Sequence, residues 1–269
     1  MQAPVLIRGG GELASGVALR LHRAGINLVI TELPQPLAVR RWVAFAEAVY
    51  QGEVTIEGVS ACLVENIDQA AEILATGAIP VLVDPEASVR EALNPLVLVD
   101  ARLTKRPSFE KLSATPLVIG LGPGFVAGSN CHAAIETNRG HFLGRVIWQG
   151  SPEPDTGVPE GVASRSADRV LRAPVEGEFQ PHASIGDLVS AGDLIATVDG
   201  QEILAPFQGV VRGLIHGGLD VRGGLKVGDV DPRGDPRYCS TVSDKSLAVG
   251  GGVLEAILSR PDLRRRLWP

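Results

Sequence analysis

Short β-branched runs alternate with helical patterns over the first hundred or so residues of this 269-residue chain, and this alternation constrains the fold most. Strands separated by helices are typical of βαβ units, whose strands lie parallel in one sheet. We expect strands at residues 4–8, 27–31, 61–65, 80–84, 96–100 and 117–121. The helical spacing between them is carried by Leu13, Val17 and Leu21 and then by Ile67, Ala70, Ala71 and Leu74. The sequence therefore predicts the α/β class, with a Rossmann-like parallel sheet domain over residues 1–150.

The second half of the chain has a different composition and sequence pattern. Residues 151–168 are rich in Pro, Gly, Ser and Asp without periodicity, which predicts a linker or long loop. An internal repeat follows at an offset of 32 residues, so that Ala173-Pro174 returns as Ala205-Pro206 and Gly177 as Gly209. We expect an all-β domain over residues 169–235 and a C-terminal segment over residues 236–269, helical between Ser243 and Arg260.

This repeat resembles the barrel-sandwich hybrid of biotinyl and lipoyl carrier domains, because both repeats carry Ala-Pro-x-x-Gly and the first also carries Gly186-Asp187-x-Val189. A carrier domain of that family needs a Lys at the tip of the hairpin between its halves. The tip here is Asp199-Gly200-Gln201-Glu202. We therefore expect no covalent biotin or lipoate, and a domain that serves as a binding or docking platform.

Charge and cysteine content exclude several classes of protein. The net charge is −6, so no basic surface is available to displace the counterions of a nucleic acid. Three widely spaced cysteines without a C-x-x-C motif indicate neither a disulfide framework nor a zinc knuckle. No stretch approaches the about 18 apolar residues that a membrane span needs, and no signal peptide precedes the first strand. The prediction is a cytoplasmic protein without nucleic-acid or membrane partners, with homo-oligomerisation left open.

The strongest local motif is Gly9-Gly10-Gly11-Glu12-Leu13-Ala14, which fits G-x-G-x-x-A between the first strand and the first helix. In such a turn Gly9 permits the tight bend, Gly11 lets a pyrophosphate approach the backbone, and Ala14 permits close packing of helix on strand. The N-terminus of the helix, at Glu12, attracts the anion. This motif predicts nucleotide-phosphate binding, and the alternative is a tight structural turn.

An acidic residue supports the nucleotide interpretation. Glu32 ends the second expected strand, 21 residues after Gly11. A carboxylate there can accept hydrogen bonds from a ribose 2′-hydroxyl and disfavours a 2′-phosphate. We therefore expect Glu32 to contact the ribose of a bound nucleotide.

Two further groups of residues are candidates for the same site. Gly120, Gly122 and Gly124 form a second glycine-rich turn after a strand, where open α/β sheets place ligands, although an ordinary loop explains them equally well. Arg139 lies in a polar segment, residues 130–141, and could clamp a phosphate or carboxylate, whereas the alternative is an ion-paired turn. Cys131 and His132 are adjacent, which does not suit a shared metal, so no metal site is predicted. No catalytic residue is assigned, since G-x-S-x-G, H-E-x-x-H and a Ser-His-Asp order are all absent.

Several longer motifs resemble one family along nearly the whole chain. They are the segments 7–14, 31–36, 45–50, 120–125, 135–141 and 249–256, which read IRGGGELA, TELPQP, FAEAVY, GLGPGF, IETNRGH and VGGGVLEA. Together they resemble the YqeB-type accessory proteins of the selenium-dependent molybdenum hydroxylase system, with a role like that of XdhC-type chaperones. One departure is that Lys105-Arg106 is followed by Pro107 where that family has Asn.

The resemblance implies a cytoplasmic maturation factor for a molybdenum hydroxylase, with the apo-enzyme as its partner. Its ligand would be a nucleotide or dinucleotide, namely a molybdopterin dinucleotide or its precursor, held by the glycine turn and Glu32. Two alternatives from other classes are an NAD-dependent oxidoreductase that uses the same cleft and a non-enzymatic assembly scaffold.

Overall fold

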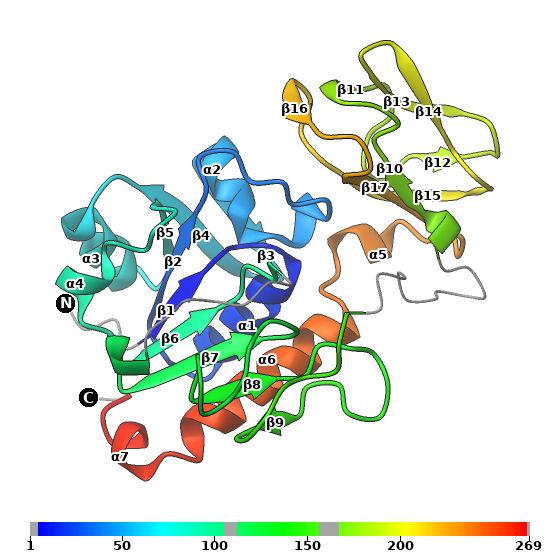
Figure 1. Cartoon of the computed structure of the whole chain (residues 1–269). Helices are drawn as coiled ribbons and strands as arrows, with labels where there is room; N and C mark the ends of the chain where they lie inside the picture. The colour runs from blue at the N-terminus through cyan, green and yellow to red at the C-terminus, as the bar shows by residue number, and fades with distance from the viewer. Residues whose placement is uncertain (1–4, 105–111, 156–166, 268–269) are drawn as a thin grey trace. The chain divides into compact units, whose positions relative to one another are not determined.

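A computed structural model describes residues 5–104, 112–155 and 167–267. The chain divides into two compact units, which exchange a short segment (Figure 1). Unit 1 consists of Met1–Pro36, Ala44–Asp155 and Val242–Pro269, and unit 2 of Leu37–Val43 and Thr156–Thr241. No helix among the described residues is long and apolar enough to cross a membrane.

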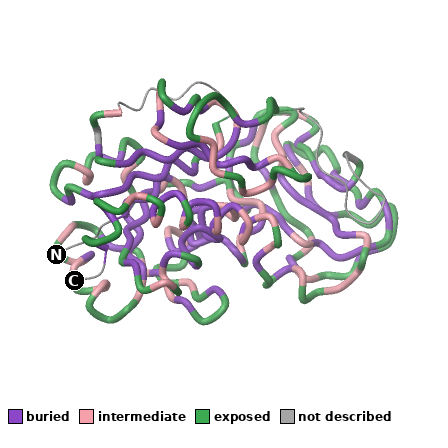
Figure 2. The backbone as a smooth tube through the Cα atoms, turned by 90° about the horizontal axis from the view of Figure 1, so that it is seen from below, coloured by how far each residue is buried: buried purple, intermediate pink, exposed green. Residues whose placement is uncertain are grey.

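Unit 1 is built on one nine-stranded sheet in the order β3-β4-β5-β2-β1-β6-β7-β8-β9. The strands are β1 (Val5–Arg8), β2 (Leu28–Glu32), β3 (Glu53–Ile56), β4 (Val59–Val64), β5 (Ile79–Val83), β6 (Val97–Asp100), β7 (Leu117–Leu121), β8 (Ala133–Ile135) and β9 (Val146–Ile147). Neighbours from β4 to β8 are parallel, while β3 and β9 pair antiparallel at the two edges. The central strands β1, β6 and β7 are buried along their whole length. Figure 2 draws the buried residues of the chain in purple. All six strands expected from the sequence are present.

The helices of unit 1 are α1 (Glu12–Arg23), η2 (Phe45–Glu47), α2 (Ala48–Gln51), α3 (Ile67–Ala75), α4 (Arg90–Leu93), η3 (Leu112–Ala114), α6 (Asp244–Leu258) and α7 (Pro261–Arg264). Two of them, α3 and α6, begin at residues whose side chains cap them. The Asn66 side chain accepts hydrogen bonds from the N–H groups of Asp68 and Gln69 and so starts α3. Ser243 caps α6 in the same way, which confirms the helix expected near the C-terminus.

Helices α1 and α6 pack with little space between their backbones. A Cβ on Gly16 of α1 would lie 2.4 Å from the Ser246 carbonyl oxygen, and one on Gly250 of α6 would lie 2.5 Å from the Gly16 carbonyl oxygen. The segment after Thr241 therefore returns to unit 1 and fixes α1 against the sheet. Helices α3 and α4 cover a core formed by Leu6, Val29, Leu98 and their neighbours.

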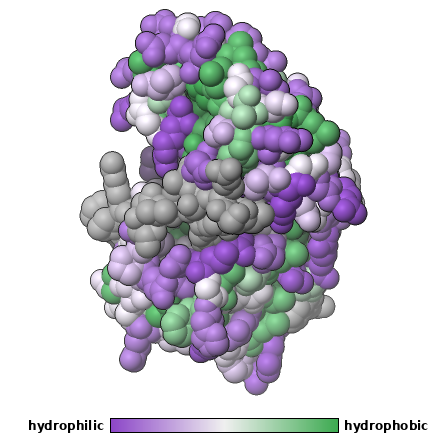
Figure 3. Space-filling model, turned by 90° about the vertical axis from the view of Figure 1, so that its right-hand side faces the viewer, coloured by the Kyte–Doolittle hydropathy of each residue, from purple (hydrophilic) through white to green (hydrophobic). Residues whose placement is uncertain are grey.

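Unit 2 contains two antiparallel four-stranded sheets around a separate apolar core. One sheet has the order β10-β17-β15-β12 and the other β14-β13-β11-β16. The strands are β10 (Val170–Arg172), β11 (Gly177–Pro181), β12 (Leu188–Val189), β13 (Leu194–Val198), β14 (Gln201–Leu204), β15 (Gly209–Leu214), β16 (Leu219–Val221) and β17 (Lys226–Asp231), with η1 (Arg41–Val43), η4 (Ala167–Arg169) and α5 (Arg237–Ser240) beside them. Leu188, Leu194 and Leu204 of unit 2 are exposed large hydrophobic residues. On the face of the protein in Figure 3, hydrophobic residues (green) lie between hydrophilic ones (purple).

The fold class predicted from the sequence is wrong for both parts. Unit 1 has a mixed sheet instead of a Rossmann-like parallel one, because the tight turn at Glu57-Gly58, with positive φ at both residues, folds β3 back on β4, and β9 folds back on β8. Unit 2 has two antiparallel sheets instead of a biotinyl/lipoyl-like barrel-sandwich hybrid. Strands of one repeat join the sheet of the other, since β12 pairs with β15 and β16 with β11.

The boundaries of the two compact units differ from the domain boundaries expected from the sequence. The expected parts are residues 1–150, 151–168, 169–235 and 236–269, whereas residues 37–43 belong to unit 2 and residues 242–269 to unit 1. The exchange at 37–43 rests on contacts inside unit 2. The Val39 carbonyl accepts a hydrogen bond from Leu214 N at 2.8 Å, and Arg40 donates to the carbonyls of Tyr238 and Thr241.

Candidate functional site: a glycine turn at the strand ends of unit 1

Two glycines shape the turn after β1, and each is required for a different structural reason. Gly9 has a φ of +93°, which favours glycine, and its N–H donates to the Thr31 carbonyl at 2.7 Å. Gly10 is required by packing, because a Cβ there would lie 2.8 Å from Ala46 N, and that N–H donates to the Gly10 carbonyl. The residues after η1 thus hold the turn in one shape.

Gly11 is different, because none of the described residues fills the space next to it. A Cβ on Gly11 would meet none of their atoms within 4 Å, and its φ of −66° suits any residue. It is the N-cap of α1, and no side chain caps this end of the helix. Glu12 is in the first turn, and Ala14 is buried against the sheet. The first N–H groups of α1 and its dipole therefore face an open position at which an anion is favoured.

Glu32 lies beside this turn at the end of β2. Its Oε2 accepts a hydrogen bond from Gly10 N at 2.6 Å and its Oε1 from Leu33 N at 2.7 Å. Burial raises the pKa of the Glu32 carboxyl, although both hydrogen bonds act in the opposite direction. The structure therefore brings Glu32 and the glycine turn together, as the sequence pattern indicates.

Two exposed apolar side chains flank Glu32. Leu33 follows Glu32 in the chain and is 46% exposed. Val83 on β5 is the register partner of Glu32 and is 44% exposed. Large apolar side chains with this exposure at adjacent strand ends offer a surface for a flat apolar group. Neither residue was singled out from the sequence.

The same strand ends carry a row of polar side chains that sequence reasoning missed. Thr31, Arg8 and Asp100 are register partners on β2, β1 and β6, and all three are buried. Arg102 follows β6 and donates to both oxygens of the Asp100 carboxylate. The available signal was an Arg and an Asp as the last residues of otherwise apolar strands.

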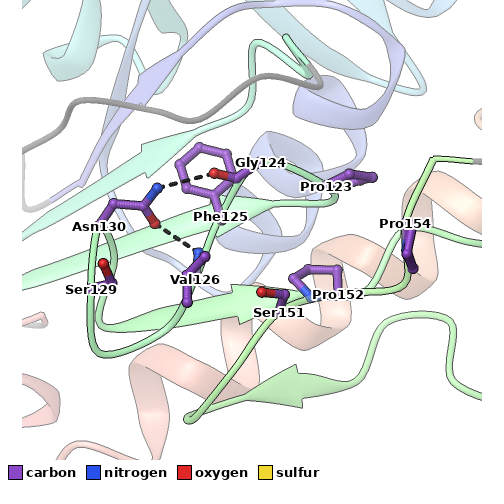
Figure 4. A pocket seen from close by; sticks show the side chains of 9 residues that line it. All are labelled: Pro123, Gly124, Phe125, Val126, Ser129, Asn130, Ser151, Pro152 and Pro154. Atoms are coloured by element: carbon purple, nitrogen blue, oxygen red, sulfur yellow. Dashed lines mark hydrogen bonds between the residues drawn. The ribbon is translucent and has the colours of Figure 1, made fainter.

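Packing also requires two glycines of the second glycine turn. A Cβ on Gly120 would overlap the Phe125 ring, and one on Gly122 would lie against Thr137 Oγ1. The turn lines an open cavity of about 470 Å³, in which Asn130 accepts a hydrogen bond from Val126 N and donates to the Gly124 carbonyl (Figure 4). Gly120 pairs in register with Asp100, so this turn lies one strand further along the sheet edge than the polar row.

Among the described residues, the Arg139 side chain pairs with α6 and not with the first glycine turn. Its guanidinium donates to both oxygens of Asp244, at 2.6 and 2.9 Å, at the first turn of α6. The nearby Glu136 is buried, and its oxygens accept hydrogen bonds from the N–H groups of Asn138 and Glu153. This segment therefore uses its charges to hold loops, and the fork that a phosphate would use contacts Asp244.

The remaining polar candidates also make structural contacts. His132 Nδ1 accepts a hydrogen bond from Val118 N, and burial raises the pKa of the Cys131 thiol to about 11. Within the described ranges no group of three or more His, Cys, Asp or Glu residues could hold a metal ion. Lys105, Arg106 and Pro107 lie outside the residues that the structure describes.

The solved structures that resemble this chain come from a different group of proteins than expected. No family model matches the chain. An aspartoacylase family protein from Mesorhizobium loti covers 86% of this chain and 85% of its own, with 14% identity and a TM-score of 0.26. A succinylglutamate desuccinylase/aspartoacylase from Rhodobacter sphaeroides covers 85% of each chain, with 16% identity and a TM-score of 0.25.

These names contradict the expected function. They are aspartoacylase and desuccinylase names, and they contradict the prediction of a maturation factor that handles a pterin dinucleotide for a molybdenum hydroxylase. The likeness itself is too slight, at these TM-scores, to supply a reaction for this chain.

One curated protein is similar in sequence over nearly all of the chain. YqeB of Escherichia coli (strain K12), whose name states that it is uncharacterized, is 49% identical over 254 residues. The match covers 94% of this chain and 47% of YqeB, so the chain spans about half the length of that relative. Over the residues that align, the chain is therefore of the YqeB type.

Proposed function

We propose that unit 1 binds a ribonucleotide that carries a diphosphate, with the phosphates at the glycine turn and the ribose at Glu32. The observation that carries this proposal is the open position at Gly11. Glycines 10, 16 and 120 are required by protein atoms that a Cβ would strike, but Gly11 has no such neighbour in residues 5–104, 112–155 and 167–267. A glycine at an uncapped helix N-terminus, with open space beside it, suits close approach of a pyrophosphate to the backbone.

The surroundings of the turn fit the other parts of a nucleotide. The Glu32 carboxylate can accept hydrogen bonds from ribose hydroxyls, and the exposed side chains of Leu33 and Val83 offer an apolar surface for the base. Strands β1 and β6 are parallel neighbours from which the chain leaves in opposite directions along the sheet. Open α/β sheets bind ligands at such a switch point, outside the carboxyl ends of the strands.

The ligand class is therefore a nucleotide or dinucleotide with a free 2′-hydroxyl, and no reaction is assigned to it. We also propose that the protein acts in the cytoplasm, because Cys62, Cys131 and Cys239 are all free thiols.

The decisive experiment is calorimetric titration of the full chain with ADP, CDP and NAD⁺. We expect at least one to bind, and we expect Gly11→Val to weaken it by at least tenfold because the side chain fills the phosphate position. The matched control is Gly251→Val on α6, since Gly251 also faces open space in unit 1. If none of the three binds the wild type, or if Gly11→Val binds as tightly as Gly251→Val, the proposal is wrong.

A further inference from the structure

Proline shapes the strand ends at which the base of the proposed nucleotide would lie. Pro34 and Pro36 follow β2, and Pro85 follows β5, which pairs in parallel with β2. Because proline has no N–H group, none of these three positions can donate a hydrogen bond from its backbone. A base placed between the two loops therefore meets fewer backbone donors than loops without proline would offer.

The first N–H group after each of these two strands is already engaged. Leu33 N donates to Glu32 Oε1 at 2.7 Å, and Asp84 N donates to the Glu32 carbonyl at 3.0 Å. The donors nearest to the strand ends therefore bind protein atoms. Gln35 lies between the two prolines of the first loop, and its side-chain amide both donates and accepts, so it favours neither kind of base.

Asp84 adds an acceptor at the end of β5. It is half-buried, and its Oδ2 accepts a hydrogen bond from Val89 N at 2.8 Å, which holds the carboxylate in place. A carboxylate has about four lone-pair sites, so one such bond leaves it able to accept others. Asp84 directly follows Val83, the register partner of Glu32. It therefore borders the apolar surface of Leu33 and Val83 that is proposed above to contact the base.

Arg8 reaches the loop after β5 from the side of the protein interior. Its guanidinium donates to the Pro85 carbonyl at 2.8 Å, and the residue is only 5% exposed. This hydrogen bond orders the backbone next to Asp84. Because the guanidinium is covered by protein, it supports the loop and is not placed to meet a carbonyl oxygen of a base.

We propose that the nucleotide bound by unit 1 carries a base with an exocyclic amino group, adenine or cytosine, and that Asp84 selects this base. The amino group donates a hydrogen bond to the Asp84 carboxylate, while Leu33 and Val83 contact the ring. A base with a carbonyl group in that place, hypoxanthine or uracil, loses this hydrogen bond and brings two acceptors face to face. This inference rests on the proposed nucleotide site and specifies its ligand.

The test compares nucleotides whose bases carry either the amino or the carbonyl group. Calorimetric titration of the full chain pairs ADP with IDP, CDP with UDP, and NAD⁺ with its hypoxanthine analogue. We expect at least one amino nucleotide to bind at least tenfold more tightly than its carbonyl counterpart. If every carbonyl nucleotide that binds does so as tightly as its counterpart, or more tightly, the base proposal is wrong while the nucleotide site stands. If none of the six binds, both proposals are wrong.

The variant Asp84→Asn tests the residue itself. While the amide oxygen of Asn accepts the hydrogen bond from Val89 N, its NH₂ group replaces the second carboxylate oxygen and donates instead of accepting. We expect the preference for the amino base to fall at least tenfold. The matched control is Asp193→Asn in unit 2, because Asp193 also accepts a hydrogen bond from a backbone N–H, that of Ser190, at 2.7 Å. The same preference in both variants would refute the role of Asp84.

A measurement on the wild type covers the case in which Asp84→Asn does not fold. A carbodiimide with glycine ethyl ester modifies accessible carboxylates, and peptide mass spectrometry locates the modified residues. We expect the bound amino nucleotide to slow modification of Asp84 at least fivefold, while the exposed Asp193 of unit 2 reacts at an unchanged rate. Equal rates at Asp84 with and without the nucleotide would show that the base does not contact it.

Discussion

Individual glycines of unit 1 have different structural roles, although they are the same residue type in the sequence. A Cβ would strike Ala46 at Gly10 and Phe125 at Gly120, whereas at Gly11 it would meet no atom within 4 Å in the part of the chain that the structure describes. The printed sequence cannot separate these cases, because each depends on a partner far away in the chain. The functional interpretation therefore attaches to Gly11 and Glu32 and not to every glycine of the two turns.

The protonation of Glu32 gives a prediction at this scale. Because burial raises the pKa of its carboxyl, the fraction of carboxylate falls sooner than for an exposed Glu as the pH is lowered. The protonated form accepts hydrogen bonds from ribose hydroxyls less well, so we expect nucleotide affinity to fall as the pH drops from neutral toward that raised pKa. Calorimetry over a pH series measures this dependence.

The control for this prediction is Glu32→Gln. We expect the variant to bind more weakly by about 1–3 kcal/mol at neutral pH, the range for hydrogen bonds to a charged group. It should also lose the acid-side dependence. An identical pH profile in the variant would show that another group titrates.

Glu136 gives a second prediction, which concerns stability. Its carboxylate accepts hydrogen bonds from Asn138 N and Glu153 N, both at 2.7 Å, and the residue is 2% exposed. Glu136→Ala would leave these N–H groups without that acceptor, so we expect a loss of about 1–3 kcal/mol in the free energy of unfolding. Urea titration measures it, with Glu72→Ala on the exposed side of α3 as the control, expected within about 0.5 kcal/mol of wild type.

At the scale of elements, a strand was predicted where its local sequence has a clear apolar pattern and was missed where that pattern is weak. The six expected strands are mostly apolar and mostly buried, and the structure contains all of them. The missed strands are weaker in sequence: β3 is mostly exposed, β8 is the short run Ala-Ala-Ile, and β9 has two residues. Because β3 and β9 are the antiparallel edges, missing them gave the wrong sheet class.

The candidate site divides in the same way. The glycine turn and Glu32 follow directly from the ends of β1 and β2, and the sequence pattern predicted them as candidates; the structure brings them together. The polar row of Arg8, Thr31 and Asp100 depends on the register of three strands, which no local pattern reveals. Arg139 shows the converse, since its partner Asp244 is 105 residues away.

The contact of α6 with its neighbours gives an element-scale prediction. A Cβ on Gly252 would lie 2.1 Å from the Gly144 carbonyl oxygen, while one on the adjacent Gly251 would meet nothing within 4 Å. We expect Gly252→Ala to lower the free energy of unfolding by about 1–3 kcal/mol through overpacking. The matched change Gly251→Ala should raise it by about 0.5–1 kcal/mol, because Ala favours a helix over Gly. Urea unfolding followed by circular dichroism distinguishes the two, and equal effects would contradict the close packing of α6.

At the scale of the whole molecule, the chain crosses between its two units several times, yet each unit has its own apolar core. The core of unit 2 comes from both of its sheets and from Cys239, and a separate core lies under α3 and α4 in unit 1. Domains with separate cores can unfold in separate transitions. The nucleotide proposal places all of its residues in unit 1, so ligand binding should stabilise that unit alone.

Tryptophans in the two units allow this last prediction to be measured. Trp42 lies in unit 2, where its ring contacts the position of Gly186, and Trp148 lies in unit 1. Trp42→Phe combined with Trp268→Phe leaves Trp148 to report on unit 1, while Trp148→Phe combined with Trp268→Phe leaves Trp42 to report on unit 2. At a nucleotide concentration of about 100 times Kd, we expect the unit 1 transition to gain about 2.7 kcal/mol and the Trp42 transition to stay in place. A shift of equal size at both reporters would instead show that the two units unfold together, because a ligand held by residues of one unit can stabilise the other only through cooperative unfolding.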